Sequence, residues 1–105
     1  MPRVEYEDVF SADLSAELSY LRARQERAWI TNLHDDLAEL TALLTHFPEA
    51  GRELARKRTV TLRKLRLRRA PFYIWYTFDS AIANGPVRFL RLFHVRQRTP
   101  EPRLP

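Results

Sequence analysis

A dense run of basic side chains stands between residues 63 and 69, where five of seven positions carry a positive charge. The five are Arg63, Lys64, Arg66, Arg68 and Arg69. Like charges at this density repel one another unless an anion lies nearby, and the planar guanidinium group suits carboxylate or phosphate. The run therefore predicts a surface for a polyanion or an acidic protein segment. Internal pairing with Asp35, Asp36 and Glu39 is the alternative.

Two further residues near the end of the chain extend this possible chemistry. His94 and Arg96 lie at the end of the last predicted strand. RNA cleavage without a metal needs an acid or base, which an imidazole supplies near neutral pH, and cations that hold the phosphate. If the chain is a nuclease, its candidate catalytic residues are therefore Lys64, Arg66, His94 and Arg96. The alternative for His94 is a strand-end histidine packed on an aromatic neighbour.

Several other kinds of site are excluded or disfavoured by composition. The chain has no cysteine, which excludes disulfides, thiolate zinc sites and cysteine nucleophiles. His34, His46 and His94 are scattered, so we expect no metal site. Gly51 and Gly85 are the two glycines, too few for a phosphate-cradling loop, and we expect no cofactor. Without an apolar run of membrane-span length, we expect a cytoplasmic protein that does not contact membranes.

The charge of the 105-residue chain is divided unevenly along its length. Residues 1–50 carry 4 arginines and 10 acidic residues, whereas residues 51–105 carry 14 basic and 3 acidic residues. A chain of this length forms one domain in most proteins. We expect a single domain over residues 1–98 and a proline-rich tail over residues 99–105, with the polyanion-binding surface in the second half.

Apolar periodicity locates the elements that must position these side chains. Spacing typical of amphipathic helices predicts one helix over about residues 11–25 and a second over about 28–46, which stops before Pro48 and Gly51. A period-two pattern predicts a short strand over residues 4–9. Further strands are expected at residues 59–67, 72–78 and 87–95. The predicted fold is α+β: an N-terminal strand and a two-helix hairpin packed on a mainly antiparallel sheet of about four strands.

Three details of the strand region are also predicted. Residues 56–58, all basic, are expected to form a solvated connector after the second helix. The phase of the leucines around Arg63 predicts an irregularity there. In the last strand, regular alternation places Phe89 and Phe93 on one side and Leu90 and Leu92 on the other.

Several short elements follow one another from the end of the second predicted helix onward: Pro48, Gly51 with Arg52, Pro71 with Phe72 and Tyr76, and His94 with Arg96. In their order and spacing they resemble the RelE/ParE superfamily of type II toxin-antitoxin toxins. The resemblance implies a small toxin that a cognate antitoxin neutralises, and it is compatible with a toxin-antitoxin hetero-oligomer. The family contains gyrase poisons resembling ParE and ribosome-dependent mRNA endonucleases resembling RelE, which share a fold.

The choice between these two activities depends on the C-terminal segment. RelE-like nucleases commonly place a tyrosine or a further histidine there, whereas this chain has only His94 after Tyr76. The resemblance therefore favours a ParE-like toxin that inhibits growth through DNA gyrase and is not an enzyme. A metal-independent endoribonuclease acting on mRNA at the ribosome is the second reading, and a non-toxic nucleic-acid-binding module is the third. Candidate contacts to the target or the antitoxin are Arg63, Arg66, Arg68, Arg96 and Arg98.

Overall fold

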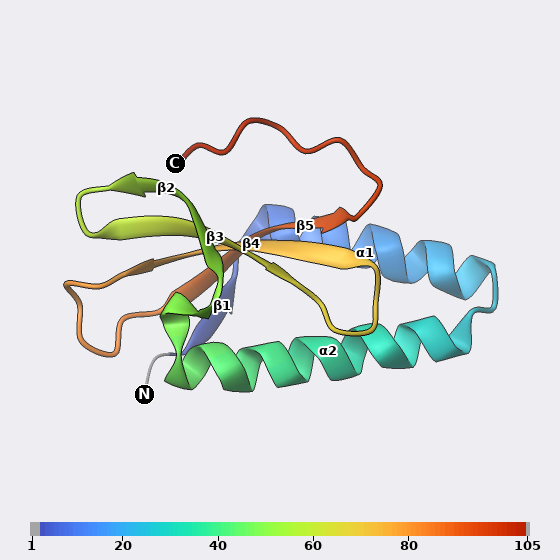
Figure 1. Cartoon of the computed structure of the whole chain (residues 1–105). Helices are drawn as coiled ribbons and strands as arrows, with labels where there is room; N and C mark the ends of the chain where they lie inside the picture. Colours follow the sequence, from blue (N-terminus) through green and yellow to red (C-terminus); the bar gives the residue numbers. More distant parts are fainter. Residues whose placement is uncertain (1–2, 105) are drawn as a thin grey trace.

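The chain folds into a five-stranded sheet with a helical hairpin packed on one face (Figure 1). This computed structural model describes residues 3–104. In chain order the elements are β1 (Val4–Tyr6), α1 (Asp8–Ala23), α2 (Arg27–His46), the 3-10 turn η1 (Pro48–Ala50), β2 (Arg52–Lys57), β3 (Val60–Arg66), β4 (Phe72–Asp79) and β5 (Val87–His94). The predicted α+β class is confirmed, with five strands in place of about four.

Both helices turn an apolar stripe toward the sheet, as their sequence periodicity predicts. The buried leucines and phenylalanine of the two stripes are Phe10, Leu18, Leu21, Leu33, Leu37, Leu40 and Leu44. Helix α1 begins at Asp8, earlier than expected, and a carboxylate in the first turn is favourable there because it faces the positive end of the helix dipole. Helix α2 has nearly the predicted bounds.

The strands run in the order β1-β5-β4-β3-β2. Strand β1 pairs with β5 in parallel, and the remaining neighbours are antiparallel. Strand β2 is the element that the sequence prediction missed, because its residues 56 and 57 were assigned to a connector. It is an edge strand that pairs only with β3 and leaves both ends exposed, so its charged residues tolerate the strand conformation.

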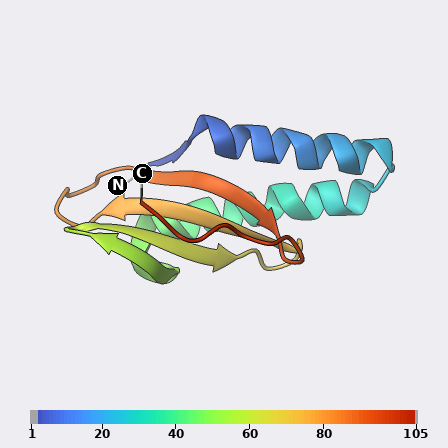
Figure 2. The same cartoon turned by 90° about the horizontal axis from the view of Figure 1, so that it is seen from above.

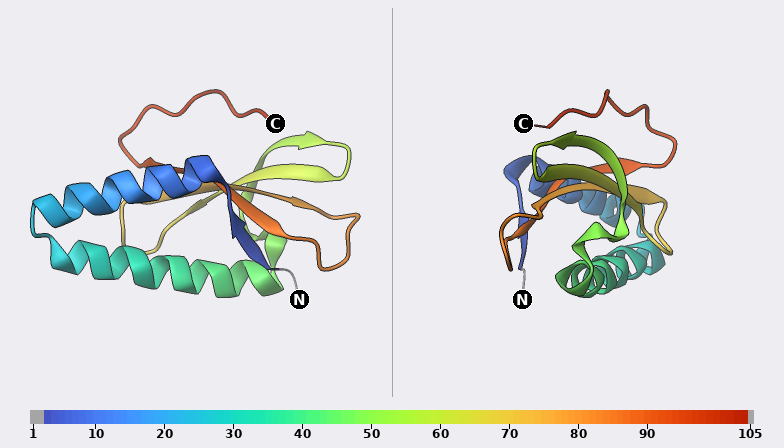
Figure 3. Two further views of the ribbon diagram at one scale, coloured as in Figure 1. Left: turned by 180° about the vertical axis from the view of Figure 1, so that it is seen from behind. Right: turned by 60° about the vertical axis from the view of Figure 1, so that its left-hand side comes forward.

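The two faces of the sheet differ in what covers them (Figures 2 and 3). The helix-covered face holds the main core, including Ile74, Tyr76 and Phe89. The opposite side, here called the open face, carries a smaller cluster of Leu62, Trp75 and Phe93, and the C-terminal residues pass over it. Strand β3 alternates regularly between these faces, so Leu62 is buried on the open face and Leu65 is half-buried against the main core.

Two bulges shift the register of the sheet. One lies between Glu53 and Ala55 of β2, opposite Arg63, so the irregularity expected near Arg63 is present but its extra residue belongs to β2. The other lies where Trp75 and Tyr76 of β4 meet β5. Because of this second bulge, Phe93 lies on the open face with Leu90, while Leu92 joins Phe89 in the main core. The regular alternation predicted for this strand is therefore wrong.

Tyr76 ties the end of the helical hairpin to the sheet. Its hydroxyl donates to the carbonyl of Pro48 at 2.7 Å and accepts from the backbone N–H of Gly51 at 2.8 Å. The residue is fully buried, and this burial raises the pKa of Tyr76 above its ordinary value. The hydroxyl thus holds η1 and the start of β2 in place and keeps the edge strand aligned with β3.

Candidate functional site

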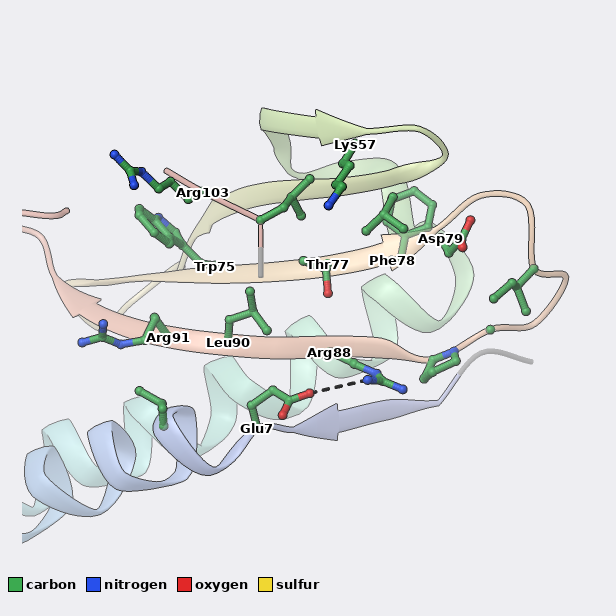
Figure 4. Close-up of a pocket in the computed structure, with 16 residues that line it drawn as sticks. Glu7, Lys57, Trp75, Thr77, Phe78, Asp79, Arg88, Leu90, Arg91 and Arg103 are labelled. Carbon is green, nitrogen blue, oxygen red and sulfur yellow. Dashed lines mark ion pairs between the residues drawn. The ribbon is translucent and has the colours of Figure 1, made fainter. Parts of the chain in front are cut away.

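The open face carries a groove with a volume of about 830 Å³ (Figure 4). Strands β3, β4 and β5 form its floor with apolar side chains such as Val60, Trp75 and Leu90. Lys57 from β2 and Arg103 from the C-terminal segment reach its border. A hollow that combines an apolar floor with charged borders suits a protein segment better than a small, fully enclosed ligand.

Trp75 is the central aromatic residue of this floor. Its ring meets Phe93 edge-on with centroids 4.9 Å apart, and the residue is only 6% exposed. Its indole Nε1 is the one buried side-chain nitrogen or oxygen atom in the described part of the chain that has no hydrogen-bond partner. Buried indole N–H groups usually find an acceptor, so this atom marks a place where an additional acceptor would be stabilised.

Charged side chains of both signs stand at the border of the groove. Lys57, Arg88, Arg91 and Arg103 are its basic residues. Two carboxylates, Glu7 and Asp79, also lie there. Figure 4 shows Glu7 beside Arg88, at 3.8 Å. The Thr59 hydroxyl donates to Asp79 at 2.6 Å and thereby lowers the pKa of Asp79, which keeps this carboxylate ionised. Arg91 is paired with Asp13 of α1 at 2.8 Å and Arg103 with Glu101 at 3.7 Å, so Lys57 is the one cation of the groove that makes no ion pair with residues 3–104.

A positively charged surface lies along β3, outside the groove. Strand alternation places Lys64 and Arg66 together on the open face, opposite Trp75 and Tyr73 respectively. The Lys64 ammonium lies 4.4 Å from the centre of the Tyr73 ring, a cation–π contact. Arg66 is exposed and forms no ion pair with any of residues 3–104. These two predicted residues therefore remain available for an external anion.

Arg63, in contrast, is used within the fold. Its guanidinium donates to the carbonyls of Glu49 and Gly51 at 3.0 and 2.8 Å and to the Thr61 hydroxyl at 3.1 Å. Its side chain is only 14% exposed and lies 3.7 Å from a carboxylate oxygen of Glu53. Arg63 thus braces η1 against the sheet on the helix-covered side, and its predicted role in binding a partner has no support from its position.

This difference gives a direct prediction for stability. Replacing Arg63 with alanine should lower the free energy of unfolding by about 2 kcal/mol, because two carbonyls lose a charged donor. Replacing Arg66 with alanine should change it by less than about 0.5 kcal/mol. Urea denaturation followed by circular dichroism measures both values. Equal losses in the two variants would contradict the division of the basic run into internal and external members.

The end of the basic run is also paired internally. Arg69 binds Asp36 and Glu39, each at 2.9 Å. Arg68 lies 3.7 Å from Glu39, although its side chain is 73% exposed. Asp36 and Glu39 therefore form the internal ion pairs with the basic run that were considered as the alternative to partner binding. Arg68 also remains exposed enough to contact a partner. Asp35, the third acid considered, makes none of the ion pairs found among residues 3–104.

His94 is separated from the cations with which it would act in a nuclease. It pairs with Phe72 in the sheet, and the two rings meet edge-on at 5.4 Å on the helix-covered side. Its Nδ1 accepts the backbone N–H of Arg96 at 3.1 Å. Lys64 and Arg66 lie on the opposite face. The structure brings Lys64 and Arg66 together but separates His94 from them. His94 instead packs on an aromatic neighbour at the end of its strand, as the alternative for this residue predicts.

The remaining predicted residues lie after the last strand. Arg96 and Arg98 are exposed at the beginning of the C-terminal segment, and their side chains make no ion pair with residues 3–104. No group of three or more histidine, cysteine or carboxylate residues in that range is arranged to hold a metal ion. Neither of the two described helices has the length and apolar character needed to cross a bilayer.

Sequence reasoning missed the residues that line the groove. Arg88 and Arg91 were overlooked because both fall within the last strand, and a regular alternation would put them on opposite sides of it. Lys57 was placed in a connector. Trp75 is buried, but nothing in the sequence indicates that its indole nitrogen lacks a partner. The bulge in β5 is the feature that gathers these arginines over the groove.

Comparisons with known proteins identify the fold. No protein-family model matches the chain, and no curated protein matches it. One similar solved structure is a chain described as the chromosomal ParDE TA system from P. aeruginosa, with a TM-score of 0.65 and 18% sequence identity. The match covers 91% of this chain and 98% of that chain. The α+β fold of residues 3–104 is thus similar to that of this ParDE chain, in agreement with the fold that the resemblance of the sequence elements implies.

Proposed function

We propose that this chain is a ParE-like toxin of a type II toxin-antitoxin system, which arrests growth by inhibiting DNA gyrase and is neutralised by a cognate antitoxin. The observation that carries the proposal is the unpaired cationic surface of Lys64 and Arg66 on a fold similar to that of a ParDE chain. An exposed arginine without an internal partner is suited to a protein carboxylate. Such a surface requires no catalytic group.

The position of His94 supports this activity over mRNA cleavage. General acid–base catalysis requires the acid or base to lie within hydrogen-bond reach of the reacting atoms, with the phosphate-binding cations beside it. His94 packs on Phe72 on the helix-covered side of the sheet, whereas Lys64 and Arg66 project from the open face. A phosphate held by these two cations would therefore lie away from the imidazole.

The antitoxin contact that we propose uses a small groove between α2 and β3. This groove has a volume of about 180 Å³ and includes Leu43, which is 40% exposed. Arg66, at the end of β3 where the two faces meet the edge of this groove, and Arg68 line it, as do Asp36 and Glu39, which are paired with Arg69. An antitoxin segment with an apolar anchor for the groove and carboxylates for the two arginines would match this chemistry.

Two activity assays run side by side test the target. The purified protein should inhibit DNA supercoiling by purified gyrase and leave translation of a reporter mRNA intact. Expression of the chain should arrest growth, and co-expression of the neighbouring small open reading frame should relieve the arrest. Ribosome-positioned cuts in the mRNA that are lost in His94→Ala would instead establish the nuclease and overturn the gyrase proposal.

Charge reversal tests the antitoxin surface. Arg66→Glu should weaken antitoxin binding by about tenfold or more, because a carboxylate would then oppose the antitoxin's carboxylates. Arg58→Glu, the same change at an exposed turn between β2 and β3, is the control and should bind nearly as the parent does. Isothermal titration calorimetry gives both affinities. An unchanged affinity in Arg66→Glu would remove Arg66 from the interface.

A further inference from the structure

The apolar cluster on the open face is buried although both described helices lie on the other side of the sheet. Its members Leu62, Trp75 and Phe93 are at most 6% exposed. Side chains on a sheet face without a helix layer are usually in contact with water. After β5 the chain turns back and crosses the sheet on this side (Figures 1 and 3). The chain's own C-terminal segment therefore supplies part of the cover.

Leu104 is the residue of this segment that enters the cluster. It packs there beside Leu54 of β2 and Leu90 of β5, and it lines the open-face groove. It is half-buried, whereas each of residues 96–103 is exposed. The groove thus accommodates an apolar side chain from an extended segment, and the segment reaches the cluster through one anchor.

The segment is held by little else. The backbone N–H of Gln97 donates to the carbonyl of His94 at 2.9 Å, and no backbone hydrogen bond joins residues 98–104 to the rest of the described chain. The ion pair between Arg103 and Glu101 lies within the segment, with both side chains at least 80% exposed. Release of the segment would therefore break the apolar contact of Leu104 and leave the hydrogen bonds of the sheet intact.

The prolines of the segment explain how one leucine can hold it. Pro100 and Pro102 fix their φ angles near −65°, which limits the conformations of the free segment. Such a segment loses less conformational entropy when it closes than a segment without prolines does. The hydrophobic contact of Leu104 then has a smaller entropic cost to offset. A small gain set against a small cost keeps the closed and open states close in free energy.

We propose that residues 98–104 form a strap that opens and closes over the open face of the sheet, with Leu104 as its anchor. In closed molecules Leu104 occupies part of the groove and shields Trp75. In open molecules the apolar floor of the groove is accessible, so binding to this floor is limited by the open fraction. The strap is separate from the groove between α2 and β3 and does not rest on the toxin activity.

Fluorescence of Trp75 tests the strap in the full-length chain. Trp29, on the exposed side of α2, is first replaced by phenylalanine so that Trp75 is the one remaining tryptophan. Leu104→Ser in this background should raise the quenching of Trp75 by acrylamide and shift its emission to the red. Leu104→Met, which keeps an apolar side chain, should leave both as in the parent. Equal quenching in all three proteins would overturn the proposal.

Thiol labelling tests the anchor from the side of the segment. The chain has no cysteine, so a single introduced thiol reports on its own position. Leu104→Cys places the thiol at the anchor, and Thr99→Cys places it on an exposed part of the same segment. A disulfide reagent should label Leu104→Cys several-fold more slowly, because access controls the reaction. In urea the two rates should become similar. Equal rates in the folded protein would contradict a closed state held by residue 104.

A third variant tests whether the strap is a balance between two states. Neither Pro100 nor Pro102 lines the groove. Changing both to glycine should nevertheless raise the quenching of Trp75, because the open state gains conformational freedom. Quenching as in the parent would indicate a fixed segment and would overturn the proposal.

The same fluorescence measurement distinguishes an intramolecular strap from an exchange between two molecules. Quenching should not depend on protein concentration, because the segment closes on its own chain. Quenching that falls as the concentration rises would mean that Leu104 comes from a second copy, and would overturn the intramolecular strap. None of these readouts uses gyrase, an antitoxin or growth, so they succeed or fail independently of the proposed function.

Discussion

Asp36→Ala is expected to lower the free energy of unfolding by about 3 kcal/mol, because it removes one partner of a buried, hydrogen-bonded ion pair. The Asp36 side chain is only 1% exposed. Its carboxylate accepts the backbone N–H groups of Arg69 and Ala70 at 2.8 and 2.7 Å and the Arg69 guanidinium at 2.9 Å. The alanine variant leaves these donors without an acceptor. Urea denaturation followed by circular dichroism measures the loss.

Glu39→Ala is the matched control. Glu39 lies one helical turn further along α2 and binds the same arginine, also at 2.9 Å, but its side chain is 44% exposed. Water can replace the lost contact, so this change should cost less than about 1 kcal/mol. A similar loss in the two variants would show that the backbone donors held by Asp36 contribute little, contrary to the expectation for Asp36→Ala.

The contrast between these acids explains how one basic run serves two purposes. Asp36 binds the backbone of the connection between β3 and β4 and so joins α2 to the sheet at that point. Arg69 completes this internal contact. Arg66, three residues earlier in the chain, projects to the open face without such a partner. The geometry of β3 and of the connection after it therefore divides the basic run. Arg69 pairs within the fold, whereas Arg66 faces outward, although the two are close in the sequence.

The helices and the central strands could be predicted from the sequence because their burial follows a simple period. Helix α2 was placed within a residue of its observed start, and the strongly apolar β4 was also located closely. Strand β2 could not be identified in this way. It lies at an edge and buries little, so its residues carry no clear alternation, and its strand conformation depends on pairing with β3.

The site was predictable in composition but not in arrangement. The sequence correctly indicated an excess of arginine in the second half, yet it could not show that Arg63 is bound by carbonyls of residues 49 and 51. Such contacts depend on how the helical hairpin meets the sheet. The groove depends on the β5 bulge, which turns Arg91 onto the open face, and on the return path of the C-terminal segment. None of these features has a local signature.

Gly51→Ala is expected to destabilise the fold by about 3 kcal/mol, through crowding rather than through backbone strain. The backbone of Gly51, with φ −77° and ψ 156°, is one that alanine adopts readily. A methyl group there would lie 2.7 Å from the hydroxyl oxygen of Tyr76 and 2.9 Å from the carbonyl oxygen of Lys64. The latter belongs to a strand, so the edge of the sheet must move. Urea denaturation should show the loss.

Two further variants separate crowding from the loss of the Tyr76 hydrogen bond. Gly85→Ala, at the other glycine, meets mainly the exposed side chain of Ile82 and should cost about 1 kcal/mol or less. Adding Tyr76→Phe to Gly51→Ala should not restore stability, since ring carbon Cε1 at 2.8 Å and the Lys64 carbonyl remain in the way. Recovery of the parent's stability in that double variant would mean that the hydroxyl alone excludes a side chain at residue 51. The strand backbone would then have room for the methyl group, and the tight junction between η1 and β3 would not be the reason for a glycine there.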